Sequence, residues 1–408
     1  MFHHSYFKSH NTRIFGNCIY FYNLTKQRVV PEFIVSLNRL VKKFGHKEIE
    51  LNFENAGYVY AYPITTIVGI MHYFKTEYGI NFIIKTGSSF LNQLGIIQQY
   101  SVKDGVFDSL NKIWIYNNSD EANIITLKII KNIRRHLPCA VGVLDTCEWA
   151  LYEVMDNVIQ HSGAKNGFVM ASINSKNKIL NICVFDYGVG IYNSLLRSCA
   201  YKPKNDADAI SLAIKEGVTS GSGQGYGLSG LTKIINKNGG GLTIISGKGG
   251  LRYDRIKQEV FNFEDIILFN KNNPSTTVNF YLKTDNETSI EDTIGKHYAN
   301  IELESLENVN EEIVFVIKDQ ALGTATRSEA EKIRNEIINI HRSTNRFVVI
   351  DFWGVAIISS SFADELIAKM IFELGYIQFQ YIFKIRNTNS SISSIINMAI
   401  EKRGKRND

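Results

Sequence analysis

Residues 179–190 read Ile-Leu-Asn-Ile-Cys-Val-Phe-Asp-Tyr-Gly-Val-Gly, and this stretch decides the fold prediction for the middle of the chain. Its apolar first part predicts a strand, which ends at Asp186. Gly188 and Gly190 then allow the backbone to turn closely. A carboxylate at a strand end can accept a hydrogen bond from an exocyclic amine. By itself, the stretch is more typical of an ordinary acidic turn between a strand and a helix.

The segment before this strand predicts an amphipathic helix between Leu144 and His161, because apolar residues recur there at helical spacing. Glu153 and Asn157 are four positions apart, so they lie on one face of the helix. A carboxylate and an amide oxygen placed this way can hold Mg²⁺ and orient a hydroxyl for attack on phosphorus. We expect Asn157 to be the Mg²⁺ ligand and Glu153 the catalytic base, supported by Asp156 and His161. An ordinary helix with a polar outer face is the alternative.

Residues 221–228 form a glycine-rich loop, Gly-Ser-Gly-Gln-Gly-Tyr-Gly-Leu, ahead of a helical run at 229–237. Backbone N–H groups of such a loop can face an anion, and the start of the helix adds its dipole. No Gly-Lys-Ser/Thr follows, and the acidic residue of dinucleotide sites is missing, so neither of those loop types applies. The expected cofactor-binding residues in this region are Thr219, Gly223, Gly225, Tyr226, Gly227 and Leu228.

The order of these segments carries more information than any one of them. Expected strands at 167–173, 179–185, 241–245 and 276–282 supply a sheet. The long polar segment at 192–224 suits a lid. The order of helix, strand, acidic turn, lid, glycine loop and helix resembles the GHKL ATP-binding fold of gyrase, Hsp90, histidine kinases and MutL. The resemblance implies ATP and Mg²⁺ as cofactors, with Asp186 binding the adenine N6 amine and with Gly188 and Gly190 beside the base.

Composition indicates a folded, soluble chain of two to four domains, with 408 residues, 44% hydrophobic residues and a net charge of +5. The basic residues are dispersed, so no nucleic-acid partner is expected. The five cysteines show no paired metal-ligand spacing, which fits a reducing cytoplasm. Residues 55–74 carry no charge, but Pro63, His72 and several tyrosines favour a buried strand, turn and helix over a membrane span. We therefore expect a cytoplasmic protein without a membrane partner.

Residues 347–366 read as an apolar strand, a turn, a second apolar segment, a small-residue corner and a helix. A strand at 313–318 and an amphipathic helix at 327–341 precede them. This pattern in the C-terminal hundred residues resembles STAS-type domains, the α/β modules of anti-sigma-factor antagonists, and especially the STAS-like bacterial domain of uncertain role.

The region 48–75 repeats this outline more faintly. The expected parts are a strand at 49–53, a second segment at 55–62, a corner at Pro63 and a helix at 64–73. This N-terminal module offers no serine at its corner, so we expect a docking or sensing role for it.

The serine corner of the C-terminal module has two interpretations. In sporulation and stress-response switches, a kinase of the GHKL class phosphorylates a STAS serine before a helix, and the resemblance places that serine at Ser360. Ser359 stands where the family often has aspartate, and Phe362 replaces its usual glycine. The alternative is that these serines cap the helix, with Ser361 able to do so directly.

Together these patterns predict an α/β protein in which an α+β two-layer sandwich ATPase domain is flanked by STAS-like α/β domains. The expected boundaries are 1–120 for the N-terminal module, 121–286 for the ATPase domain, 287–305 for a linker and 306–408 for the C-terminal domain. His136 is followed by Leu137-Pro138 and lies close before Glu153, which favours an exposed turn over a phospho-accepting histidine.

Three functions stay open after this reading. They are an ATP-regulated switch, an anti-sigma-type protein serine/threonine kinase, and a nucleotide-sensing scaffold without turnover. The expected partners are ATP and a protein bound through the STAS-like modules. A second copy of the chain, forming a homodimer, is a further candidate partner.

Overall fold

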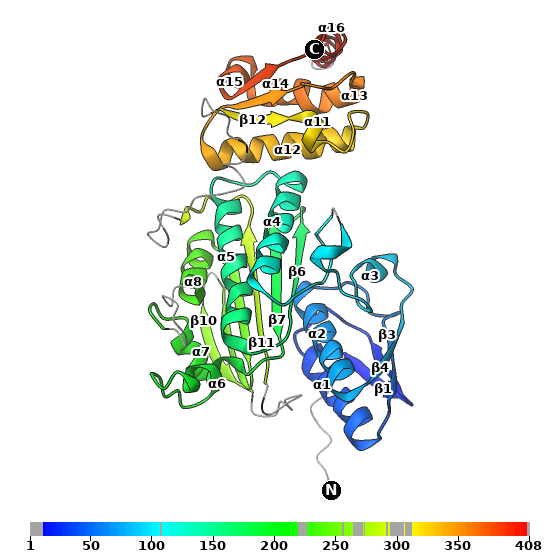
Figure 1. Cartoon of the computed structure of the whole chain (residues 1–408), viewed down its shortest axis with the longest axis vertical. Helices are drawn as coiled ribbons and strands as arrows, with labels where there is room; N and C mark the ends of the chain where they lie inside the picture. Colours follow the sequence, from blue (N-terminus) through cyan, green and yellow to red (C-terminus); the bar gives the residue numbers. More distant parts are fainter. Residues whose placement is uncertain are drawn as a thin grey trace. The chain divides into compact units, whose positions relative to one another are not determined.

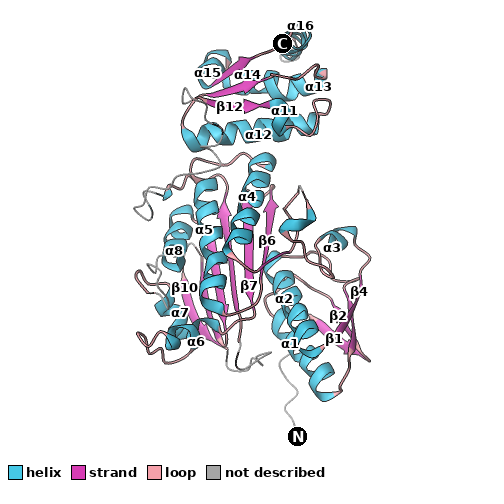
Figure 2. Cartoon of the chain, viewed as in Figure 1, coloured by secondary structure: helices cyan, strands magenta, loops and turns pink. Residues whose placement is uncertain are grey.

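The computed structural model describes residues 11–106, 108–218, 227–254, 257–263, 272, 274–290, 293, 306 and 312–405, and it has the expected mixed α/β fold. Contacts divide the chain into two compact units, whose helices and strands are shown in Figures 1 and 2. Unit 1 combines Met1–Lys128 with Trp149–Lys283, and unit 2 combines Ile129–Glu148 with Thr284–Asp408. Within the described residues, no helix combines the length and the apolarity that crossing a bilayer requires.

The N-terminal part of unit 1 is a sheet in the order β1-β2-β3-β4, where β1 and β2 pair antiparallel and the later pairs are parallel. Its elements are β1 (Thr12–Phe15), β2 (Cys18–Phe21), α1 (Val29–Asn38, continued by a π-helical turn at Arg39–Lys43), β3 (Glu48–Asn52), α2 (Ala61–Tyr78), β4 (Asn81–Lys85) and α3 (Ser89–Gln93). The expected corner at Pro63 is wrong, because α2 already begins at Ala61. Proline is tolerated in the first helical turn, where backbone N–H groups have no intrahelical partner.

The second sheet of unit 1 follows the order β10-β9-β8-β11-β7-β6-β5 in the described chain, and all neighbouring strands are antiparallel. Its strands are β5 (Trp114–Tyr116), β6 (Gly167–Asn174), β7 (Ile179–Asp186), β8 (Gly241–Ser246), β9 (Gly249–Tyr253), β10 (Gln258–Asn262) and β11 (Thr276–Lys283). The four expected strands are confirmed as β6, β7, β8 and β11. The register places Asp186 opposite Gly167 on one side and Thr276 on the other.

Both faces of this second sheet are buried. Phe168 and Phe185 belong to one core with the N-terminal sheet and its helices. Gly69 of α2 lies so close that a methyl group there would be 2.1 Å from the Phe185 ring. Val169 and Val184 point the other way, because side chains alternate along a strand. That face is covered by α4 (Ser119–His136), α5 (Val143–Asn157) and α8 (Gly227–Asn238), as Figure 1 shows.

The segment between β7 and α8, expected as a polar lid, contains two helices, α6 (Gly190–Arg197) and α7 (Asp206–Ala213). The start of α7 packs on the β8–β9 turn. There the Asp206 carboxylate accepts a hydrogen bond from the Lys248 backbone N–H at 2.9 Å. A methyl group at Gly249 would lie 2.5 Å from the Asp206 backbone, so this contact requires glycine.

Unit 2 contains a parallel sheet in the order β12-β13-β14 among the described residues. Its elements are β12 (Ile313–Val316), α11 (Ile317–Gln320), α12 (Arg327–Thr344), β13 (Val348–Asp351), α13 (Ser360–Ala363, continued by a π-helical turn at Asp364–Ala368), α14 (Lys369–Leu374), α15 (Tyr376–Ile382), β14 (Phe383–Arg386) and α16 (Ser390–Gly404). The expected strand at 313–318 is shorter than predicted, since helix α11 begins at Ile317.

Segment Ile129–Glu148 of unit 2 comprises the end of α4, the loop after it and the start of α5. Arg135 of α4 forms an ion pair of 2.6 Å with Glu329 of α12. The Asn339 side chain of α12 donates to the backbone oxygens of Arg134 and Leu137 at 2.8 and 2.9 Å. His136 is exposed, and it is the last residue of helix α4 rather than part of a turn.

Candidate functional site

The structure brings Glu153 and Asn157 together with the start of α8. A methyl group placed on Gly227, the first residue of α8, would lie 3.0 Å from Glu153 Oε2 and 3.0 Å from Asn157 Nδ2. The two side chains are one turn apart near the end of α5, as their spacing predicts. Gly227 leaves open the space that both side chains border. The helix start there is also where an anion would find unpaired backbone N–H groups.

The Asn157 amide carries a feature that suits a ligand-binding role. Its Nδ2 atom is buried and has no hydrogen-bond partner within the described part of the chain. A buried amide without a partner costs free energy. The two ends of a side-chain amide are interchangeable by rotation, so Asn157 can turn its oxygen toward the same space. An oxygen donor suits a hard cation such as Mg²⁺, and the residues present therefore fit a Mg²⁺–phosphate group.

Asp156 points toward α4. Its Oδ1 accepts a hydrogen bond of 2.8 Å from the Ser119 hydroxyl at the first residue of α4. Neighbouring residues on a helix point about 100° apart, so Asp156 and Asn157 face different surroundings. In this structure, Asp156 fastens the start of α4 to the end of α5.

His161 lies in the π-helical turn Val158–Ser162 that continues α5. Burial lowers the pKa of its imidazole, and the Asp156 carboxylate partly opposes that shift. The neutral form is therefore favoured. His161 is placed within the electrostatic reach of Asp156, on the segment that leads from Asn157 to Ser162.

Asp186 ends β7 with its side chain in the protein interior, and the residue is only 4% exposed. Burial raises the pKa of its carboxyl group to about 7, although a 2.8 Å hydrogen bond from the Gly188 N–H favours the ionised form. Such a group accepts or releases a proton near neutral pH. A ligand amine that donates to it would shift it toward the carboxylate.

The turn after Asp186 packs directly on the segment that follows Asn157. The Val189 N–H donates to the Ser162 carbonyl oxygen at 2.8 Å. A methyl group on Gly188 would lie 2.2 Å from that same oxygen, so the packing requires glycine. Gly190 has a φ of +74°, which glycine adopts without strain. Ser162 therefore connects the two halves of the candidate site.

Sequence reasoning missed two supports of this turn. Buried Ser246, at the end of β8, accepts the Ile191 N–H at 2.8 Å and donates to the Ser275 carbonyl oxygen at 3.2 Å. The Ser275 N–H in turn donates to the Gly188 carbonyl oxygen at 3.1 Å. Neither serine belongs to a recognisable sequence pattern, since strand pairing alone brings them here.

The structure describes only some residues of the glycine-rich loop that was expected to bind phosphate. Thr219, Gly223, Gly225 and Tyr226 lie outside the described residues. Gly227 and Leu228 form the first turn of α8, and the Leu228 carbonyl oxygen accepts from the Thr232 hydroxyl at 2.8 Å. The described site therefore consists of the end of α5, the turn after β7 and the start of α8.

The serine corner of unit 2 is organised around Ser359. Its Oγ accepts the Phe362 N–H at 3.0 Å, so the expectation that this serine corner caps the helix is confirmed, but the cap is Ser359 and not Ser361. Ser361 is held by Ser359 instead, at 2.9 Å between the two hydroxyl oxygens. Ser360 is the first residue of α13 and is exposed.

Comparisons with known proteins concern parts of the chain. Residues 329–393 match the family model described as a STAS-like domain of unknown function (DUF4325). The search of curated proteins returned no match. Among solved structures, the mycobacterial sensor histidine kinase MprB shares 17% identity, and the alignment covers 41% of this chain and 95% of that chain. Its TM-score of 0.24 is too low to establish a shared fold.

Proposed function

We propose that the protein is a regulatory switch that binds Mg²⁺–ATP beside α5 and passes its nucleotide state to the STAS-like modules. The observation that carries this proposal is the meeting of Glu153, Asn157 and the start of α8, with the Asn157 amide lacking a partner within the described chain. Mg²⁺ commonly keeps few protein ligands and binds the phosphates of its nucleotide, so a single amide ligand from the protein suits this ion.

Each residue has a distinct part in this proposal. Asn157 offers its amide oxygen to the ion, and Mg²⁺ supplies charge neutralisation to the phosphates when bound. Glu153 accepts the proton of the attacking water or hydroxyl. Asp186, held in the core, accepts the exocyclic amine of the base, while the first turn of α8 faces the phosphates.

The route to the output module runs along α4 and α5. Each of these helices has residues in unit 1 and in unit 2. The end of α5, which bears Glu153 and Asn157, belongs to unit 1, and the start of α5 belongs to unit 2. Asp156 binds the start of α4 through Ser119, and the other end of α4 pairs with α12 through Arg135. A change at the nucleotide therefore acts on helices that continue into the unit containing the STAS-like domain.

A protein serine kinase is the second candidate, and the state of Ser360 favours it. Ser359 and Ser361 are occupied with each other and with the helix cap, whereas Ser360 is exposed at the first position of α13. Its hydroxyl is therefore the accessible one at the corner, where the resemblance places the phospho-acceptor.

The deciding experiment for the nucleotide site is isothermal titration calorimetry with ATP and Mg²⁺. We expect Asn157→Ala to abolish Mg²⁺-dependent ATP binding, because it removes the proposed ion ligand. The matched control is Asn236→Ala, the same change at an exposed position of α8. Equal affinity in the wild type and Asn157→Ala would overturn the assignment.

Incubation with γ-labelled ATP separates the remaining candidates. Release of free phosphate without labelled protein supports the switch. Label on the protein that disappears in Ser360→Ala supports the kinase. Binding with neither outcome leaves the nucleotide-sensing scaffold.

A further inference from the structure

A cavity of about 660 Å³ lies in unit 1, lined by the region of α1 and α2 on one side and by β8 to β11 on the other. It opens on the sheet face opposite the one covered by α4, α5 and α8. Thr277 of β11 lines it and lies 3.5 Å, between hydroxyl oxygens, from Thr66 of α2. Val278, the next residue, points to the other face. The volume falls in the range of roughly 300–1,000 Å³ that is typical of small-molecule pockets.

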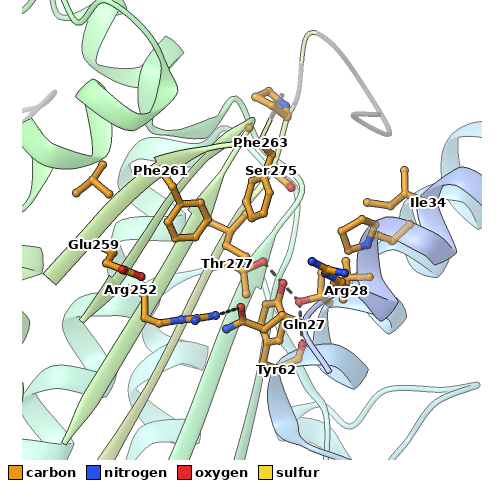
Figure 3. A pocket seen from close by; sticks show the side chains of 18 of the residues that line it. Gln27, Arg28, Ile34, Tyr62, Arg252, Glu259, Phe261, Phe263, Ser275 and Thr277 are labelled. Atoms are coloured by element: carbon orange, nitrogen blue, oxygen red, sulfur yellow. Dashed lines mark hydrogen bonds between the residues drawn. The ribbon is translucent and has the colours of Figure 1, made fainter. Parts of the chain in front are cut away.

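Both walls of this cavity carry apolar side chains among polar ones, and Figure 3 shows Ile34 on one side and Phe261 and Phe263 on the other. Phe261 and Phe263 contribute from the sheet side, in an edge-to-face pair with ring centroids 4.9 Å apart. Val30, Ile34 and Ile70 contribute from α1 and α2. A flat or flexible apolar body can therefore be enclosed between rings and aliphatic side chains.

The charged side chains at the cavity favour an anion. Arg28 and Arg252 both line it, from the α1 side and from β9 respectively. Glu259 also lines it, but this carboxylate forms an ion pair with Lys257. Arg252 donates a hydrogen bond to the neutral Gln27 side chain, which leaves its charge uncompensated by that contact. Guanidinium groups bind carboxylate, sulfonate or phosphate oxygens well, because their N–H groups form a planar fork.

We propose that this cavity is a binding site for a small organic anion with an apolar body, whose acidic head is held by Arg28 and Arg252 and whose body packs against Phe261 and Phe263. The site is separate from the nucleotide site and does not depend on it.

The same cavity reaches the turn that follows Asp186. Pro274 and Ser275 line it, and the Ser275 N–H donates to the Gly188 carbonyl oxygen at 3.1 Å. A methyl group on Gly190 would lie 2.8 Å from the Pro274 ring. A ligand that contacts Pro274 and Ser275 therefore touches the same segment that holds the Asp186 turn in place through the Ser275–Gly188 hydrogen bond. We infer that occupancy of the cavity changes nucleotide affinity, a linkage that rests on the proposed function above.

The first test uses two related fluorescent probes with the full chain. 8-Anilinonaphthalene-1-sulfonate carries an acidic head, and N-phenyl-1-naphthylamine has the same rings without it. We expect the double variant R28Q/R252Q to weaken the sulfonate roughly tenfold or more and to leave the neutral probe within about twofold. The matched control is Lys248→Gln, an exposed cation on the β8–β9 turn that does not line the cavity.

A variant that fills the cavity tests whether the two probes bind inside it. Ile245 of β8 lines the cavity, lies opposite Thr277 in the strand register and is only partly buried, so Ile245→Trp adds bulk inside the cavity. It should weaken both probes at least tenfold, with circular dichroism confirming an intact fold. The proposal is overturned if the wild type binds neither probe, if R28Q/R252Q binds the sulfonate as the wild type does, or if both probes bind Ile245→Trp unchanged.

The second test addresses the linkage by titrating Mg²⁺–ATP with and without saturating sulfonate. A change of twofold or more in ATP affinity that is absent in Ile245→Trp supports the linkage, and an unchanged affinity in the wild type refutes the linkage alone. Failure of ATP to bind at all would count against the nucleotide site, and the probe experiment would still decide the cavity.

Discussion

Asp186 shows how burial alone can change what a side chain does. An exposed aspartate is ionised at neutral pH, but the interior position at the end of β7 raises the pKa of this carboxyl group to about 7. Between the ordinary pKa of 3.8 and about 7, the folded protein holds a proton that the unfolded chain releases. The contribution of this group to stability therefore falls as the pH rises through that window.

The pH dependence of nucleotide binding follows from this shift. An amine of the base donates better to the ionised carboxylate, so binding of ATP releases the proton, and the affinity should increase up to about tenfold per pH unit below pH 7. Calorimetry from pH 6 to pH 8 measures this rise. GTP is the control, because it shares the triphosphate but has no donor amine at the corresponding ring position.

The variant Asp186→Asn removes the titrating group. We expect it to reduce the preference for ATP over GTP and to abolish the difference between their pH profiles. An unchanged preference would show that Asp186 does not contact the base.

Glu153 can be tested apart from binding. Glu153→Gln keeps the size of the side chain but removes its basicity, so we expect phosphate transfer or release to fall at least about 100-fold. ATP affinity should stay within about threefold, as measured by calorimetry. Glu373→Gln, the same change at an exposed position of α14, is the control. Undiminished turnover in Glu153→Gln would contradict its role as the base.

Among the elements, the contact between the β7 turn and the π-helical turn after α5 has the strictest requirement. The Ser162 carbonyl oxygen accepts the Val189 N–H and leaves only 2.2 Å for a methyl group on Gly188. Neither partner can move easily, because both are backbone segments that continue into a strand or a helix. The candidate site is therefore held together by backbone packing as well as by side chains.

A single methyl group tests this contact. Gly188→Ala should lower the free energy of unfolding of unit 1 by about 1–3 kcal/mol, because the backbone must shift to admit it. Gly87→Ala is the matched control: no atom lies within 4 Å of the added methyl, so stability should change by less than about 0.5 kcal/mol. Equal melting temperatures for the two variants would refute the steric argument.

For the whole molecule, the boundary between the two units falls within helices. Arg135, in α4, is 12% exposed in its side chain and pairs with the carboxylates of Glu329 and Glu336 at 2.6 and 3.4 Å. Removing one partner from a buried ion pair leaves an uncompensated charge, which typically costs about 3–5 kcal/mol. The STAS-like unit therefore relies on a segment nearly two hundred residues earlier in the chain.

Arg135→Ala should weaken α12 selectively. We expect faster hydrogen–deuterium exchange in Arg327–Thr344, and no change in α2 of unit 1. Lys332→Ala is the control, since its ammonium group lies 3.9 Å from Glu329 and is more exposed. Exchange in α12 that matches the wild type would show that unit 2 holds itself together without the α4 segment.

The sequence by itself determined the local elements and the side chains that share a face. The period of the helix placed Glu153 and Asn157 together, and apolar runs located β6, β7, β8 and β11. The sequence did not reveal strands β5, β9 and β10, because these strands are short. In addition, β9 begins with two glycines, which are poor strand formers. The helix start at Ala61 and the cap at Ser359 were also missed, since each depends on which backbone groups lack partners.

Only the tertiary structure decided what meets at the candidate site. Ser162, Ser246 and Ser275 come from three separate segments: the pairing of β8 with β11 places Ser246 and Ser275 at the Asp186 turn, and packing of the π-helical turn after α5 places Ser162 there. The same is true of the cavity between the N-terminal helices and the sheet, and of the pKa of Asp186. Local patterns reflect preferences of neighbouring residues, whereas burial, unpaired amides and close backbone contacts arise only when distant segments pack against each other.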